Sequence, residues 1–111
     1  MTPWRAPQPQ PFLNRFRGRP AIIIRYNEWL TTLETRAKGA ADTVERYAAV
    51  PVGTEVWIRC EIPGTYSDVT GRSQWWQCLA LVTKSELIGD RSYPRYRTTF
   101  ELIDHPEEGE Y

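Results

Sequence analysis

Acid–base chemistry has few candidate residues in this chain. His105 is the only histidine, and it stands next to Pro106 in an acidic stretch, where an exposed side chain is expected. Hydrolytic and transfer reactions generally need a positioned base, and the sequence does not group an acid, a base and a nucleophile. We therefore predict that the protein is not an enzyme and has no catalytic residue.

Thiol, metal and cofactor chemistry is equally sparse. Cys60 and Cys78 lack the Cys-x-x-Cys spacing and are too few for a disulfide scaffold, so we expect buried thiols in strands, with pairing left open. The acids of residues 107–110 form a short tail rather than a metal-ligand cluster. No phosphate-binding loop, dinucleotide fingerprint or nucleophile elbow occurs. We predict no metal, no cofactor and no small-molecule substrate.

Arginine and tyrosine are interleaved in residues 91–97, a composition that could bind nucleic acid. Arginine neutralises phosphate and tyrosine stacks on bases, and the candidates are Arg91, Tyr93, Arg95, Tyr96 and Arg97. A protein that depends on phosphate contacts is usually basic, whereas the isoelectric point here is about 6.6. We favour the interpretation that these charges protect an exposed sheet edge, and nucleic-acid binding is the second choice.

The first 20 residues combine proline, arginine and apolar side chains. Five prolines block helix and central strand, and they favour an extended arm. The arm also carries apolar anchors that a plain linker does not need. We predict that it docks on its own domain or on a neighbouring subunit. The predicted partner-binding residues are Trp4, Phe12, Arg15, Phe16, Arg17 and Arg19.

The two ends of the chain carry opposite charge although the net charge is zero. Residues 1–20 contain four arginines and no acid, and residues 104–111 contain four acids and neither lysine nor arginine. The acidic tail of an adjacent copy could therefore attract the arginines of the arm. Tails this short can also be solvated without a partner.

An amphipathic helix is the element expected after the arm. Apolar residues from Ile22 to Ala48 recur every three or four positions, and Pro20 suits a first helical turn. Gly39 interrupts the pattern, so we expect a helix of about 17 residues and a shorter one at residues 40–49, or one bent helix. The alternative is a strand at residues 22–29, because three successive isoleucines are β-branched.

Alternation with a period of two then predicts three strands. They comprise residues 56–62, the run 75–84, which is apolar on both faces, and residues 96–102. We predict an α+β fold with one or two helices and a small antiparallel sheet, packed on the helix or curled into an SH3-like barrel. The chain would divide into an arm at residues 1–20, one α+β domain at residues 21–104 and an acidic tail at residues 105–111.

Contact with other proteins is the function that these features favour. Five tryptophans and six tyrosines exceed what so small a core buries comfortably, and such residues are frequent in binding hot spots. No membrane span or signal peptide is recognisable, so we expect a cytoplasmic or virion location. We predict a structural or assembly subunit that binds copies of itself, such as a bacteriophage head, connector or tail component. A small nucleic-acid-binding, regulatory or inhibitor protein is the alternative.

Overall fold

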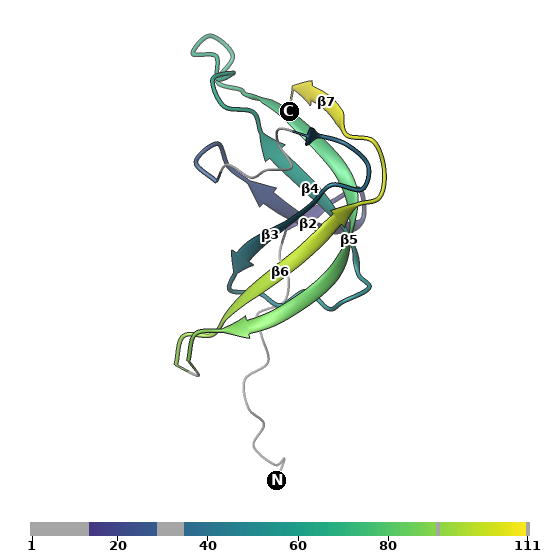
Figure 1. Cartoon of the computed structure of the whole chain (residues 1–111). Helices are drawn as coiled ribbons and strands as arrows, with labels where there is room; N and C mark the ends of the chain where they lie inside the picture. Colours follow the sequence, from purple (N-terminus) through teal and green to yellow (C-terminus); the bar gives the residue numbers. More distant parts are fainter. Residues whose placement is uncertain (1–13, 29–34, 91, 111) are drawn as a thin grey trace.

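The structure, a computed structural model, describes residues 14–28, 35–90 and 92–110. Within these ranges the chain forms seven strands and no helix (Figure 1). The strands are β1 (Arg15–Phe16), β2 (Arg19–Ile24), β3 (Ala41–Arg46), β4 (Glu55–Glu61), β5 (Gln74–Ile88), β6 (Arg95–Leu102) and β7 (Glu107–Glu110). No helix that is long and apolar enough to cross a membrane occurs among the described residues.

All seven strands belong to one mixed sheet in the order β1-β2-β4-β5-β6-β3, and β7 pairs with β5 outside this path. β2 and β4 run parallel, and the other strand pairs of the described chain are antiparallel. β5 is the central strand, since its first part pairs with β4 and β7 and its last part with β6. The register shifts between Val82 and Lys84, and such bulges bend a strand. Figure 1 shows β5 as a long, curved arrow.

The sheet curls around a core that five strands and the segment after β3 build. Alternate side chains of a strand point to the same face, and in β4 and β6 one such set is buried, while β2, β3 and β5 add further buried residues. The core comprises Ile22, Ile24, Val44, Val50, Val56, Ile58, Cys60, Trp76, Cys78, Ala80, Val82, Phe100 and Leu102. The curl brings β3 close to β2, although the two strands are not neighbours in the strand order. This approach is seen in a hydrogen bond at 2.9 Å from Arg46 Nη2 of β3 to the Ile23 carbonyl of β2.

The predicted α+β fold is wrong, because described residues that were expected to form helices form strands. Residues 22–24 pair with residues 58–60 of β4, and residues 41–46 pair with β6. Three β-branched isoleucines fit a buried strand better than a helix, so the alternative of a strand holds for residues 22–24. The apolar period was misleading, since Tyr26, which it placed on a buried stripe, is 64% exposed. Residues 29–34 of the expected helix lie outside the described residues.

The three strands predicted from alternation are confirmed as β4, β5 and β6. They do not form a separate antiparallel sheet, because β2 adds to β4 in parallel and makes the sheet mixed. Residues 15–20, expected in the arm, form β1, a turn and the start of β2. Residues 107–110, expected in the tail, form β7, and Glu108 there makes an ion pair with Arg36. Residues 1–13 lie outside the described residues.

Candidate functional site

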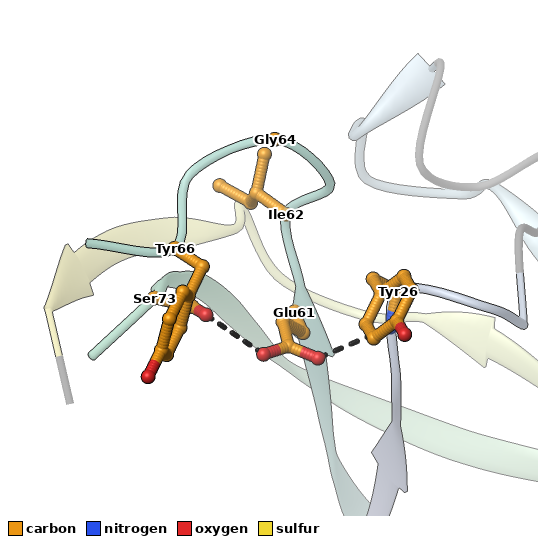
Figure 2. Close-up of a pocket in the computed structure, with 6 residues that line it drawn as sticks. All are labelled: Tyr26, Glu61, Ile62, Gly64, Tyr66 and Ser73. Carbon is orange, nitrogen blue, oxygen red and sulfur yellow. Dashed lines mark hydrogen bonds between the residues drawn. The ribbon is translucent and has the colours of Figure 1, made fainter. Parts of the chain in front are cut away.

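A hollow of about 220 Å³ opens at the carboxyl ends of the parallel strands β2 and β4. We call it the tyrosine hollow. It is lined by Tyr26, Glu61, Ile62, Gly64, Tyr66 and Ser73 (Figure 2). Pockets for drug-sized molecules begin at roughly 300 Å³, so this hollow suits one or two side chains better than a whole cofactor.

Glu61, the last residue of β4, lies between the two tyrosines of the hollow (Figure 2). Its Oε1 accepts a hydrogen bond from the backbone N–H of Tyr26 at 3.2 Å, and its Oε2 accepts one from the Ser73 hydroxyl at 2.8 Å. These bonds hold the carboxylate in one position. A carboxylate has about four acceptor sites, so Glu61 retains the capacity to bind a cationic group.

Tyr26 and Tyr66 stand at the rim of the hollow and are 64% and 65% exposed. Tyr26 follows shortly after β2, and Tyr66 belongs to the loop between β4 and β5. Thr65 fixes the base of this loop, since its hydroxyl donates to the Ile62 carbonyl at 2.6 Å and accepts from the Gln74 N–H at 2.9 Å. A tyrosine ring offers apolar area with a polar tip. Chemically, the hollow can bind apolar groups and a cation, and it contains no thiol or imidazole.

A second hollow of about 320 Å³ gathers residue types that could do chemistry. It is lined by Arg17, Trp57, Cys78, Leu79, Asp104, His105 and Glu107. The Cys78 thiol donates to the carbonyls of Leu79 and Asp104 at 3.3 and 3.2 Å. Burial raises the pKa of this thiol to about 11. A thiol that stays protonated is a poor nucleophile, so the second hollow lacks an activated cysteine.

Both cysteines are buried, as the sequence predicted, and both are free, a point that the sequence left open. Burial raises the pKa of the Cys60 thiol as well. In the part of the chain that the structure describes, no group of three or more His, Cys, Asp or Glu side chains could hold a metal ion. Among the described residues, the tyrosine hollow is therefore the better candidate for a site, and its chemistry is that of binding.

The outer face of β4 carries a cluster of aromatic rings and arginines. Phe16 of β1 meets Trp57 of β4 edge-on, with the ring centroids 5.3 Å apart and the ring planes at 86°. The Arg17 guanidinium lies 4.8 Å from the Phe16 centroid and 5.0 Å from the Trp57 centroid, and that of Arg59 lies 4.6 Å from the Phe16 centroid. Exposed cation–π contacts contribute about 0.5–1 kcal/mol each. The cluster fastens β1 to the sheet.

Three of the predicted partner-binding residues make contacts within their own chain. Phe16 packs in the cluster just described. Arg17 forms an ion pair with Glu107 at 2.7 Å, and Arg19 forms one with Glu55 at 2.5 Å. We expected the arginines of the arm to meet the acidic tail of an adjacent copy, whereas Arg17 meets Glu107 of this tail within its own chain.

The other predicted partner-binding residues are less engaged or lie outside the described chain. Arg15 Nη1 donates to the Gly18 carbonyl at 3.5 Å, a long bond at the turn between β1 and β2. Trp4 and Phe12 lie outside the described residues. Their role in docking stays a prediction.

The predicted nucleic-acid-binding residues are divided between the two faces of β6 and the loop before it. Arg95 and Arg97 lie on the outer face, where both form ion pairs with Glu45, at 3.5 and 3.3 Å. Tyr96 falls on the opposite side, toward the core, by the alternation of the strand. The remaining predicted positions are Tyr93, exposed in the loop, and Arg91, outside the described residues. One carboxylate thus offsets part of the positive charge, and the arginines do not share a face with Tyr96.

Sequence reasoning missed the tyrosine hollow. It assigned Tyr26 to a helix, and it singled out no residue between the strands expected at residues 56–62 and 75–84. A local signal exists in the Pro63-Gly64 turn followed by Tyr66, but only the pairing of β2 with β4 places Tyr26 beside Glu61. No protein-family model, no curated protein and no solved structure matches this chain.

Proposed function

We propose that the protein is a non-enzymatic assembly subunit whose residues 1–13 dock on a neighbouring copy. The observation that carries this proposal is the anchoring of the chain directly after that segment. The Ala21 N–H donates to the Asn14 carbonyl at 3.0 Å, and Phe16 and Arg17 pack against Trp57. Residues 1–13 are therefore connected to the sheet at Asn14, which is held in place. Such an attachment suits a segment that reaches a neighbouring copy.

The length and composition of residues 1–13 support the proposal. Thirteen residues span about 40 Å in the polyproline II conformation, which exceeds the roughly 30 Å diameter of a small domain. Trp4 and Phe12 are the apolar anchors, and Arg5 is the charged residue that we assign to the partner. Arg17 and Arg19 are assigned to the domain instead, because they form ion pairs with its own acids.

The particle of a bacteriophage, in its head, connector or tail, is the setting that we propose for this subunit. Chains with a compact β-rich domain and a terminal arm are common in such particles, where the arm links subunits. The features that support this analogy are the curled sheet and the attachment of residues 1–13 next to β1, which pairs with the edge of β2.

Solution mass tests the proposal, measured by light scattering at low and high salt. We expect the full-length chain to form oligomers and a Trp4→Ala/Phe12→Ala variant to be a monomer with an unchanged melting temperature, because both substitutions precede β1. A Tyr93→Ala variant is the control, since it removes an exposed aromatic ring from a loop elsewhere. A full-length chain that stays monomeric at every salt and protein concentration would contradict the proposal.

Substitution is preferable to deletion of the whole arm of residues 1–20. That deletion would remove β1 and the first residues of β2, so the domain itself would be damaged. Loss of assembly in such a variant would not separate docking from folding.

A further inference from the structure

The tyrosine hollow has the composition of a site for an extended, proline-rich segment. Grooves lined by aromatic side chains bind such segments, because the polyproline II helix is already ordered and loses little conformational entropy. Tyr26 and Tyr66 supply ring surface on two sides of Glu61 (Figure 2). Both tyrosines are more than 60% exposed, so this surface is available to a partner.

Residues 3–11 of the chain have matching chemistry. Every residue from 6 to 11 either is a proline or precedes one, and both situations restrict the backbone to extended conformations. Building on the proposed function, we infer that the tyrosine hollow binds residues 3–11 of a second copy of the chain. The prolyl rings pack against Tyr26 and Tyr66, and Arg5 lies beside Glu61.

Charge complementarity supports this occupant. Arg5 is the one charged residue of segment 3–11, and among the described residues Glu61 is the one charged residue that lines the hollow. The bonds from Tyr26 and Ser73 already orient the carboxylate of Glu61, so the Glu61 side chain loses little entropy when a guanidinium binds. The ion pair is expected to favour one direction and register of the segment more than to add affinity.

The edge of β2 favours a second copy over the chain's own segment. Asn14 pairs with Ala21 on this edge, and the hollow lies further along it, beyond Ile24. Between them, the Ile23 carbonyl accepts a hydrogen bond from Arg46. A segment of the same chain that continued β1 along this edge would meet Arg46 before it reached the hollow, whereas a segment from another copy approaches from outside.

Sedimentation equilibrium of full-length chains tests the inference. Tyr66→Ala should raise the dissociation constant of self-association at least about tenfold. Tyr93→Ala, which removes a tyrosine that is 78% exposed, compared with 65% for Tyr66, from another loop, should change it by less than about twofold. Arg5→Gln should have a smaller effect, up to about fivefold at low salt, and none at high salt. Melting temperatures of the variants are measured alongside, so that a loss of fold is recognised.

Competition with synthetic peptides identifies what the hollow recognises. A peptide of residues 1–13 should dissociate the wild-type oligomer, and a peptide with Pro7, Pro9 and Pro11 replaced by alanine should require at least about tenfold more. Equal competition by the two peptides would overturn the recognition of proline.

The outcomes separate this inference from the proposed function. If Trp4→Ala/Phe12→Ala is monomeric but Tyr66→Ala associates as the wild type does, the hollow is not the docking site and the proposed function stands. If the wild-type chain is monomeric throughout, both fall. If Tyr66→Ala weakens association at an unchanged melting temperature, and the peptide of residues 1–13 competes better than its alanine-substituted form, both are supported.

Discussion

Replacement of Arg46 by methionine should weaken the sheet where its curled ends meet. Arg46 Nη2 lies 2.9 Å from the Ile23 carbonyl oxygen and 2.7 Å from Glu28 Oε2, and Nη1 donates to the Glu45 carbonyl at 2.8 Å. β2 and β3 are not neighbours in the strand order. One side chain therefore joins two strands that the backbone ladder leaves apart, next to the fully buried Ile24.

The expected loss of unfolding free energy is about 2 kcal/mol. The side chains of Arg46 and Glu28 are 26% and 38% exposed, so solvent screens their ion pair, which we take as about 1 kcal/mol. The hydrogen bond to the Ile23 carbonyl contributes about 1 kcal/mol more. Methionine keeps much of the apolar stem that arginine packs. For a domain of this size the melting temperature should fall by about 10 °C.

Thermal unfolding followed by circular dichroism measures the effect. Arg97→Met is the matched control, because Arg97 lies on the outer face and shares Glu45 with Arg95, so its melting temperature should change by only about 2 °C. Arg46→Lys should fall between the two, since an ammonium keeps the charge but not the planar fork that serves three acceptors. Equal melting temperatures for Arg46→Met and Arg97→Met would refute the reasoning.

Two further predictions concern Phe16 and the buried thiols. Phe16→Ala should lower the unfolding free energy by about 2 kcal/mol, because the half-buried ring packs on Trp57. The folded variant should still self-associate. A variant that is as stable as the wild type but no longer associates would instead make Phe16 a residue that contacts the partner. The unfolding free energy should also fall as pH rises above about 9, because burial raises the pKa of Cys78 from 9.0 to about 11 and raises that of Cys60 as well. The unfolded chain therefore releases these protons at a lower pH than the folded chain does. Chemical denaturation at each pH measures that fall, and the same slope in Cys78→Ala would show that Cys78 does not cause it.

Strands β4, β5 and β6 could be predicted because alternation is a local code. In β4, Val56, Ile58 and Cys60 are buried and the residues between them are not fully buried, so a window of seven residues already shows the period of two. Turn residues at Gly53 and Pro63-Gly64 mark both ends. Both the strand and its inward face can therefore be predicted without knowing which strand lies beside it.

The segment of residues 21–50 could not be assigned in the same way. β2 contributes only Ala21, Ile22 and Ile24 to the buried set, and β3 contributes only Val44, so neither strand shows a full alternation. Among the described residues, the apolar positions whose spacing favoured a helix come from two strands and from the segments that flank them. Most of the stability of such short strands comes from their partners, and a strand partner outweighs local propensity.

By itself, the sequence determined the alternating strands, the proline-rich composition of the first residues and the buried character of both cysteines, because each depends on residues close together in the chain. Only the tertiary structure decided that Ile22 lies beside Ile58, 36 residues away in sequence. It also decided that Arg17 meets Glu107 within one chain, and that Tyr26 and Tyr66 flank Glu61. The parallel pairing of β2 with β4 brings Ile22 to Ile58 and Tyr26 to Glu61, and the Arg17–Glu107 pair also requires β1 beside β2 and β7 beside β5. Such long-range pairing is chosen by the packing of the whole core rather than by any local window.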